Sequence, residues 1–336
     1  MATTSNLSIF NQYSEYLLPT YSRFPKGRYA SLLVIRKTES ETIFRTEGSG
    51  EGLTKDTVIA GINANNRKPI RRVVISKRKQ TAVERRTGRE LLREHNLLKT
   101  AIVNKKEYEC TLNANAPCGE CIDCMLYGYA VGGGGAQKSR VMTDDAYSIL
   151  QASEVTGHRT FNAPSDNGIM WNPIKNEASK SINDDEYVLP ETHFLDMETL
   201  KDVTPGELQY VIGNVFRSSR YGAISSRLGK MQNSLAAIIF SDTELFSNLE
   251  LTQQVYDLLP RNEGNIEVPL FDEPVFEAVQ KATNLLLERV VGRTPLVVRE
   301  KALQQVLDDT ITLYRDRDSV KSFLQDIEKG YPSKSK

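Results

Sequence analysis

The cysteines are the residues whose type and spacing point most directly to chemistry. All four, Cys110, Cys118, Cys121 and Cys124, fall within fifteen residues at the spacing C-x7-C-x2-C-x2-C. A C-x2-C step brings two thiolates to one metal ion through a tight turn, and Pro117 and Gly119 supply turn-forming residues. Four thiolates complete the tetrahedral shell of a structural zinc ion and leave no open position for a reacting molecule. The pattern therefore predicts a structural zinc site.

Other interpretations of this cluster stay open. Thiolates at x2 spacing also hold iron–sulfur clusters, disulfides could join the cysteines in pairs, and four unrelated thiols would have no shared role. His95 could replace one cysteine as a ligand, although its helical pattern favours a surface position. Met1 to Gln12 lacks a secretory signal, and no segment has eighteen consecutive apolar residues. We therefore expect a cytoplasmic protein with no membrane partner, where disulfides are disfavoured.

The charged residues are balanced in number but unevenly distributed. The chain has 43 Lys or Arg and 43 Asp or Glu. Between Arg67 and Lys99, however, twelve residues are basic and three are acidic, whereas between Ser241 and Asp316 fourteen are acidic and seven are basic. Such a chain can turn one surface toward phosphate and another toward solvent or a basic neighbour.

The basic stretch is the first candidate for nucleic-acid binding. In RRVVISKRK, from Arg71 to Lys79, alternation buries Val and Ile partially and leaves cations exposed. Arg85 and Arg89 lie four residues apart in a predicted helix, where like charges repel and favour a neutralising anion. Such side chains bind phosphate independently of sequence. A solvated surface is the alternative, and a net charge of +9, twelve minus three, favours nucleic acid.

Two further segments combine cations with glycine. In GGGGAQKSR, a glycine backbone can approach a phosphate closely, followed by the cations and hydroxyl of Lys138, Ser139 and Arg140. The spacing differs from that of a P-loop, and a flexible hinge is the alternative. The second segment, FRSSRYGAISSRLGK, could follow a backbone and stack one base, or could simply cap a helix. Its candidates are Arg217, Arg220, Tyr221, Arg227 and Lys230.

Residues Ser153 to Pro190 are expected to leave the core as a long excursion or hairpin. This segment has little periodicity and many Asn, Ser, Pro and Gly residues. Phe161, Met170 and Trp171 are large apolar side chains within it. They could insert between bases or into a neighbour, or form a small core beneath the loop.

The elements that must position these residues alternate between strands and helices. Thr81 with Glu84 forms a capping-box pattern that predicts a helix to about Lys99, and Thr204, Pro205 and Glu207 predict the start of a second helix. From Pro274 onward the apolar spacing is helical. Strands are predicted over Tyr29–Lys37, Glu41–Thr46, Arg71–Lys79, His193–Val203 and Leu235–Phe240. These features predict an α+β sheet-and-helix core with inserted modules.

Patterns typical of catalysis are weak. His95, His158 and His193 lie far apart and match no Cys/His or Ser/His/Asp spacing. The carboxylate pairs Asp144–Asp145 and Asp184–Asp185 could bind a metal, but adjacent acidic residues are more typical of surface turns. We therefore predict a binding protein and not an enzyme.

Together, the glycine-rich loop with K-S-R, the helix–RSSRYG–strand unit and the cysteine-bearing insertion resemble the backbone subunit of type I-D CRISPR Cascade complexes, the Csc-two branch of the Cas-seven family. The resemblance covers about Tyr16 to Phe240. It implies an RRM-like (ferredoxin-like) palm with large inserted domains, including a zinc-bearing one, and a thumb-like hairpin. The palm would comprise 1–47, 126–152 and 191–270, the basic and zinc-binding insertion 48–125, the thumb 153–190 and the C-terminal helices 271–330.

The resemblance also implies a function. Such subunits polymerise along a guide crRNA, grip its backbone and present its bases to target DNA or RNA, in contact with further copies of themselves and other Cascade subunits. The thumb of one copy displaces a guide base, and Phe161, Met170 and Trp171 match its tip. The family's backbone-directed binding agrees with the missing RRM aromatic signature. The RNA-binding candidates are Arg67, Lys68, Arg71, Arg72, Lys77, Arg78, Lys138, Ser139, Arg140, Arg159, Arg217, Arg220, Tyr221 and Arg227.

Two alternative functions accompany this prediction. Related type III backbone subunits cut target RNA with a loop aspartate, and Asp56 is the nearest equivalent for a metal-dependent ribonuclease. The other alternative is a stand-alone, zinc-stabilised RNA-binding protein that forms no filament.

Overall fold

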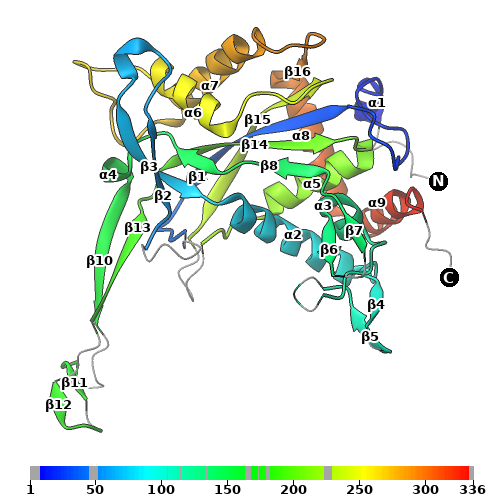
Figure 1. Cartoon of the computed structure of the whole chain (residues 1–336), viewed down its shortest axis with the longest axis horizontal. Helices are drawn as coiled ribbons and strands as arrows, with labels where there is room; N and C mark the ends of the chain where they lie inside the picture. The colour runs from blue at the N-terminus through cyan, green and yellow to red at the C-terminus, as the bar shows by residue number, and fades with distance from the viewer. Residues whose placement is uncertain are drawn as a thin grey trace.

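An antiparallel sheet of eight strands forms the centre of the chain, in the order β16-β15-β1-β14-β9-β3-β2 with β8 also paired to β14 (Figure 1). The structure, a computed structural model, describes residues 8–44, 52–103, 105–111, 113, 115–132, 135–162, 168–172, 174–178, 182–222 and 229–332. The strands of the sheet are β1 (Tyr29–Thr38), β2 (Lys55–Ile59), β3 (Pro69–Ile75), β8 (Val141–Thr143), β9 (Ala146–Ser148), β14 (His193–Lys201), β15 (Met231–Ser241) and β16 (Leu296–Val298).

Strand β1 lies at the middle of the sheet and is buried on both faces. It pairs antiparallel with β14, from Tyr29 opposite Lys201 to Lys37 opposite His193, and with β15 on its other edge. Its run of aliphatic residues is typical of a strand covered on both sides. The strands predicted at 29–37, 193–203 and 235–240 are therefore confirmed, with small differences at their ends.

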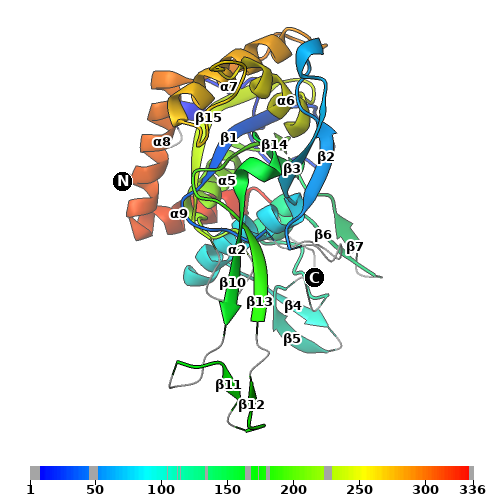
Figure 2. The same cartoon turned by 90° about the vertical axis from the view of Figure 1, so that its left-hand side faces the viewer.

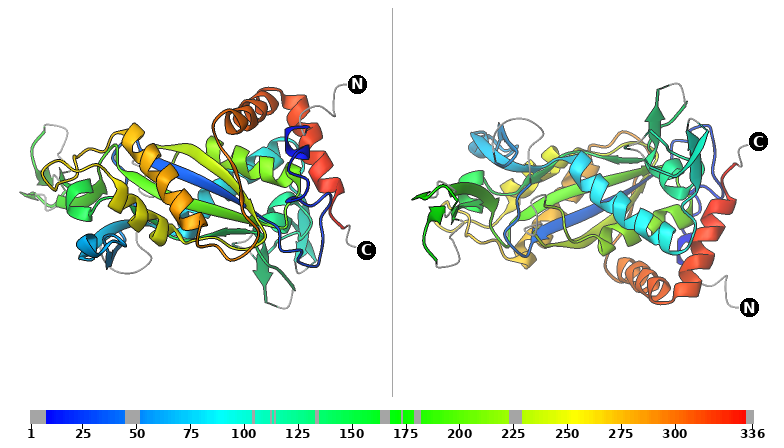
Figure 3. Two further views of the ribbon diagram at one scale, coloured as in Figure 1. Left: turned by 90° about the horizontal axis from the view of Figure 1, so that it is seen from above. Right: turned by 90° about the horizontal axis from the view of Figure 1, so that it is seen from below.

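Helices cover both faces of this sheet (Figure 3). The helices α6 (Asn248–Leu258) and α7 (Asp272–Leu287) cover one face, where Leu251 and Val279 pack in one cluster with Leu33 of β1. The opposite face carries α2 (Lys77–Glu94), α5 (Pro205–Arg217), α8 (Glu300–Arg315) and α9 (Arg317–Lys329). There Leu32, the next residue of β1, shares a cluster with apolar residues of these helices. Alternate β1 side chains thus enter two separate cores.

Helix α5 begins where the sequence predicts. The Thr204 hydroxyl accepts a hydrogen bond from the Glu207 backbone N–H at 3.3 Å, and the Glu207 carboxylate accepts one from the Thr204 N–H at 2.9 Å, with Pro205 at the first helical position. This capping box stabilises the helix by satisfying two free backbone donors. Because β14 and β15 both run antiparallel to β1, α5 joins two parallel strands that have β1 between them.

Helix α2 begins earlier than its sequence pattern predicts. It starts at Lys77 after Ser76, and not near Thr81, and it ends at Glu94 and not near Lys99. Glu84 is fully buried, and its carboxylate accepts a hydrogen bond from Arg36 of β1 and not from a backbone N–H at the start of a helix. The capping-box pattern is therefore wrong here, because the glutamate has a tertiary partner. The strand predicted over 71–79 correspondingly ends at Ile75.

The region expected as an insertion, 48–125, is divided between two places. Strands β2 and β3 extend the main sheet, because β3 pairs with β9. Beyond α2, two short hairpins and a helix gather beside one end of the sheet (Figure 1). These are β4 (Thr100–Val103) with β5 (Lys106–Glu109), β6 (Tyr129–Val131) with β7 (Gly135–Gln137), and α3 (Ile122–Tyr127). The second hairpin and the end of α3 come from 126–152, the segment expected as part of the palm. The strand predicted over 41–46 is reduced to one bridge from Thr42 to Val188, and residues 45 and 46 lie outside the described residues.

A long arm leaves the body between α4 (Ala152–Val155) and β14 (Figure 2). Strands β10 (Thr156–Asn162) and β13 (Ile182–Val188) pair along it, and the small hairpin of β11 (Trp171–Asn172) and β12 (Glu177–Ala178) lies at its far end. Trp171 is 40% exposed and Ile174 is 94% exposed. The sequence of this segment therefore leads to a projecting arm, as its low periodicity predicts.

The remaining short elements are α1 (Ser8–Asn11), which lies near α8, and the turn of 3-10 helix η1 (Ala64–Asn66). In the acidic C-terminal part, the predicted helices are confirmed as α7, α8 and α9, with the short strand β16 between the first two. Within the described residues, no helix is long and apolar enough to cross a membrane.

Candidate nucleic-acid interface and metal centre

The four cysteines converge on one point. Their sulfur atoms all lie within 4.8 Å of one another and all four side chains are buried. The Sγ atom of Cys110 is 3.4 Å from that of Cys124 and 3.9 Å from that of Cys121, so none of them forms a disulfide. Metal–sulfur bonds of about 2.3 Å in a tetrahedron place sulfurs about 3.8 Å apart. The cluster therefore fits a single tetrahedral metal ion, and His95 is not part of it.

Backbone groups of the loop point toward the sulfurs. The Cys118 N–H donates to Cys110 Sγ at 3.3 Å, and the Cys121 N–H donates to Cys118 Sγ at 3.3 Å. Gly119, in the turn between two ligands, has φ of +71°, a conformation that favours glycine. These features suit a loop that presents thiolates to a cation.

Two arginines of α2 hold this loop through one buried carboxylate. Asp123, in the first turn of α3, is 1% exposed. Arg85 donates from Nε to Oδ1 at 2.9 Å and from Nη2 to Oδ2 at 2.8 Å, and Arg89 donates from Nη1 to Oδ2 at 3.0 Å. Arg89 also donates to the Cys110 carbonyl and lies 3.6 Å from its sulfur. The anion expected between Arg85 and Arg89 is thus supplied by the protein itself.

A basic groove of about 770 Å³ lies along α2, next to this cluster. Its basic residues come from successive turns of α2 and from Lys138, and Asp144 is its one acidic lining residue. The spacing along α2 places these cations on one face, while Val83 and Leu91 face the sheet. The lining residues are Lys77, Arg78, Thr81, Ala82, Arg85, Arg86, Arg89, Thr111, Asn113, Tyr127, Lys138, Ser139, Val141, Met142, Thr143 and Asp144.

The groove brings together only some of the predicted RNA-binding residues. Four of them line it, namely Lys77, Arg78, Lys138 and Ser139. Others are exposed but lie elsewhere: Arg67, Lys68 and Arg71 near and on β3, Arg159 on the arm bound to Glu41, and Arg217 and Arg220 at and beyond the end of α5. Arg227 lies outside the described residues. Arg86, an exposed groove residue, belongs to the basic stretch between Arg67 and Lys99 that the sequence singles out, although it is not among the RNA-binding residues predicted individually.

Three of the predicted RNA-binding residues are buried and have internal partners, which corrects that part of the prediction. Arg72 donates to the backbone carbonyls of Ser148, Ile149 and Ala60, and burial lowers its pKa to about 10. Arg140 forms a two-pronged ion pair with Glu207 at the start of α5. Tyr221 is 3% exposed, and its hydroxyl donates to Glu84 at 3.0 Å. The hydrogen bonds of these three side chains therefore join elements of the core.

Arg36 is the centre of a buried polar cluster that the sequence did not reveal. Its Nη2 atom lies 2.9 Å from Glu84, 2.7 Å from Asp196 and 2.7 Å from Glu198. Nη1 donates to Tyr221 and Asn233, each at 2.9 Å. One cation thus faces three buried carboxyl groups, and burial raises the pKa of Glu84 and that of Glu198. The cluster joins β1, β14, β15 and α2.

The arm-tip candidates have different surroundings. Trp171 and Met170 lie at the far end of the arm, where Trp171 is exposed and Met170 is partly buried. Phe161 is in β10, and its side chain lies outside the described part of the structure. Strand β11, which begins at Trp171, lies at the end of the arm, far from α2 (Figures 1 and 2).

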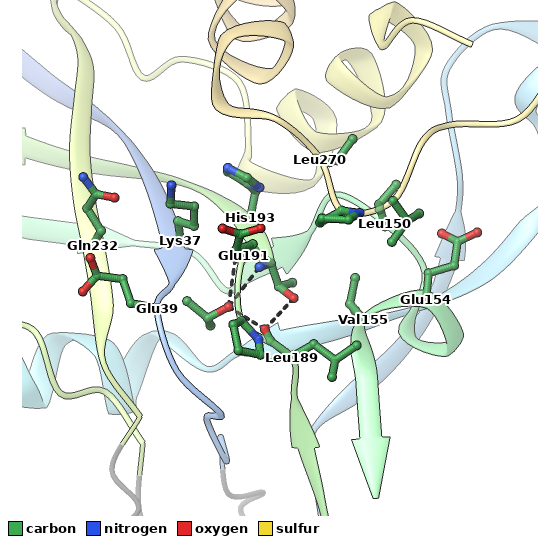
Figure 4. A pocket seen from close by; sticks show the side chains of 15 residues that line it. Lys37, Glu39, Leu150, Glu154, Val155, Leu189, Glu191, His193, Gln232 and Leu270 are labelled. Carbon is green, nitrogen blue, oxygen red and sulfur yellow. Dashed lines mark hydrogen bonds between the residues drawn. The ribbon is translucent and has the colours of Figure 1, made fainter. Parts of the chain in front are cut away.

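A second cavity, of about 530 Å³, lies where the arm joins the body (Figure 4). Its walls combine aliphatic side chains with the carboxylates of Glu39, Glu154 and Glu191, of which the first two lie on opposite sides of the cavity, and with Lys37, which is paired with Asp272. His193, on its wall, has a pKa lowered by burial, and its Nε2 is 2.8 Å from Asp272. Carboxylates repel phosphate, so this cavity is a poor match for a nucleic-acid backbone.

The acidic residues considered for catalysis do not form a metal site. Within the described residues, the four cysteines are the one group of His, Cys, Asp or Glu side chains that converges closely enough to hold an ion. Asp56 is exposed on β2, Asp145 accepts a hydrogen bond from the Lys77 N–H, and Asp184 lies 3.4 Å from His158. None of them belongs to a group of converging ligands in that part of the chain.

Comparisons with known proteins agree with this architecture. Among solved structures, the chain is similar to the crystal structure of Thermofilum pendens Csc2, with a TM-score of 0.59 and 18% identity over 97% of this chain and 98% of that one. It also matches a chain of a type IV-B CRISPR complex, with a TM-score of 0.39 and 14% identity over 61% of this chain and 90% of that one. No curated protein matches it. The first likeness shows a shared fold.

A family model described as Csc2 Crispr matches residues 16–324, which include the sheet, the groove, the cysteine cluster and the arm. This protein therefore belongs to the Csc2 family of CRISPR proteins.

Proposed function

We propose that this protein is the backbone subunit of a type I-D Cascade complex and binds guide crRNA in the groove along α2. The observation that carries the proposal is the composition of the groove: six of its described lining residues are basic and one is acidic, and two of the six, Arg85 and Arg89, bind the buried Asp123. A groove of this charge attracts a phosphate backbone. Membership of the Csc2 family supports a role in a CRISPR complex.

The groove suits recognition of the backbone and not of bases. Lys77 and Arg86 are nine residues apart on α2, which corresponds to about 14 Å along a helix and to the length of several phosphates. Lys138 adds a cation from outside α2. The one aromatic residue of the lining, Tyr127, is 4% exposed and offers little face for stacking. Bases bound this way stay free to pair with a target strand.

The other parts of the fold support further roles. The β14–α5–β15 unit around β1 is the part that we compare to an RRM-like palm, and the arm is the part that we compare to a thumb. We propose that the exposed Trp171 and its neighbour Met170 act on a guide base or on the next copy in a filament. Arg67, Lys68, Arg71, Arg159, Arg217 and Arg220 are exposed cations for additional contacts with guide or target.

For the metal site, we propose zinc held by Cys110, Cys118, Cys121 and Cys124. Zinc in a closed shell of four thiolates supplies a cross-link and no reactive position. The cysteines then fix the loop before α3 to the strand β5, beside the groove.

Fluorescence anisotropy with a labelled single-stranded RNA tests the RNA-binding proposal. The double variant Lys77→Ala/Arg78→Ala should weaken binding uniformly across RNA sequences and lower the slope of log affinity against log salt by about 1.4, at about 0.7 per lost contact on a single strand. The matched control is Lys281→Ala, which removes an exposed helical cation paired with Glu277 on α7. A flat salt response of the wild-type protein would contradict the assignment.

We further propose that the protein does not cleave RNA. The guide-loaded protein, incubated with complementary RNA and Mg²⁺, should leave the RNA intact on a denaturing gel. Regularly spaced cuts that disappear in Asp56→Ala would establish the ribonuclease alternative instead. Mass measurement with and without RNA distinguishes a filament from a stand-alone protein, because only the filament grows with the length of the RNA.

A further inference from the structure

We propose that Asp123 couples the cysteine cluster to the groove, so that metal binding and RNA binding strengthen each other through Arg85 and Arg89. The inference rests on the proposed function, because it concerns the same groove. Asp123 is a positioning residue in this scheme: it contacts neither the metal ligands' sulfurs nor the RNA, and acts through the two arginines.

The position of Asp123 depends on the cysteines. It lies between Cys121 and Cys124 in sequence, and all the residues of α3, Ile122–Tyr127, are buried. A metal ion held by both flanking cysteines would fix the first turn of α3 to Cys110 and Cys118. Loss of the ion removes this cross-link, and α3 is too short to be held by its own hydrogen bonds.

Arg85 and Arg89 link Asp123 to the groove. Both line it, although their side chains are only 16% and 13% exposed. Arg85 also donates from Nη2 to the Gly128 carbonyl at 3.1 Å, and its guanidinium lies 5.4 Å from the ring centre of Tyr127. Asp123 therefore sets the direction of both guanidinium groups and holds α2 against the segment that leads into β6.

Arg89 also contacts one of the four cysteines directly. Arg89 donates to the Cys110 carbonyl, and its Nη1 lies 3.6 Å from the Cys110 sulfur. A cation beside a coordinated thiolate stabilises its negative charge, as outer partners of metal ligands do. Asp123 is almost fully buried, so water competes little for the hydrogen bonds that it accepts from Arg85 and Arg89. Metal loss at the cysteine cluster would therefore alter the groove, and RNA bound in the groove would alter the cysteine cluster.

Thermodynamic linkage makes the proposal quantitative. If the metal tightens RNA binding by some factor, RNA must tighten metal binding by the same factor. Coupling of this kind is typically about 5- to 150-fold, and we expect about 10-fold here, because the guanidinium groups are redirected but not removed.

The experiment uses the full chain loaded with zinc. RNA affinity is measured by anisotropy before and after the metal is stripped, and zinc affinity is measured against a chromophoric chelator with and without saturating single-stranded RNA. Stripping should weaken RNA binding about 10-fold, and RNA should strengthen zinc binding by an equal factor. Asp123→Asn keeps the four cysteines and should bind both partners, with each effect reduced to less than about 2-fold.

Two further variants separate coupling from charge and from folding. Arg85→Lys keeps the charge of the groove but loses the two-pronged bond to Asp123, so it should also reduce the coupling. Glu109→Gln is the matched control: it removes a carboxylate that binds Arg93 of the same helix, but this pair is half exposed and Arg93 does not line the groove. The coupling should be unchanged in this variant.

The outcomes are distinguishable. Wild-type protein that binds zinc and RNA with no mutual effect would overturn the inference, as would full coupling in both Asp123→Asn and Arg85→Lys. Zinc-loaded wild-type protein that does not bind RNA would overturn the proposed function instead. If Asp123→Asn does not fold, the reciprocity measured on the wild-type protein and on Arg85→Lys decides the question.

Discussion

Arg36 and Arg72 lie inside the protein, whereas Arg78 and Arg86 lie on the exposed face of α2. Both inner side chains are fully buried, and Arg36 donates hydrogen bonds to carboxylates, to the Tyr221 hydroxyl and to the Asn233 amide of the protein. The outer pair faces a groove with one acidic lining residue. A buried cation is stable only where the fold supplies counter-charges, as around Arg36, or hydrogen-bond acceptors, as the backbone carbonyls around Arg72, whereas an exposed cation such as Arg86 can approach a phosphate. Surroundings, and not residue type, therefore separate the arginines of the core from those of the groove.

The largest effect on the free energy of unfolding is expected for Arg36, at the centre of the buried polar cluster. Arg36→Met would leave Glu84, Asp196 and Glu198 buried without their shared cation, a change that typically costs about 3–5 kcal/mol. Urea denaturation should show this loss. Arg293→Met, which removes an exposed arginine near Glu15, should change the free energy of unfolding by less than about 0.5 kcal/mol. Equal effects of the two variants would remove the distinction between core and surface arginines.

A smaller effect is expected for Arg140→Lys. Lysine keeps the charge but cannot make both bonds to Glu207, which also caps α5. We expect a loss of about 1–3 kcal/mol in the free energy of unfolding, which is the usual cost of an unsatisfied buried group. RNA affinity per folded molecule should not change. A loss of RNA affinity without a loss of stability would place Arg140 with the groove residues after all.

The smallest effect concerns pH. Burial raises the pKa of Glu198 well above its usual range, so the folded protein holds a proton there that the unfolded chain releases at lower pH. The contribution of Glu198 to the free energy of unfolding is fully present below the pKa of the unfolded chain, about 4.3. It is lost as the pH rises through the pKa of Glu198 in the folded protein. Glu198→Gln should therefore flatten the decline of the melting temperature with rising pH. An unchanged pH profile would show that Glu198 is not the titrating group.

Several features could be predicted from the sequence because their causes are local. The capping box of α5 involves residues three apart, and the four cysteines of the candidate metal site fall within fifteen residues. The aliphatic run of β1 likewise predicts a strand with both faces covered. By contrast, the start of α2 could not be predicted, because the glutamate that suggested a cap is bound by Arg36, 48 residues away.

The candidate site divides in the same way. Its basic composition and its clustered cysteines are visible in the sequence, so a candidate metal site and a cationic surface could be predicted from the sequence alone. Which cations face the groove depends on the tertiary structure. Arg72 binds carbonyls 76 and 77 residues away, and Arg85 binds a carboxylate 38 residues away. Partners at such separations are chosen by the packing of the sheet and its helices, and that packing determines whether a charge is neutralised inside the protein or remains for a ligand.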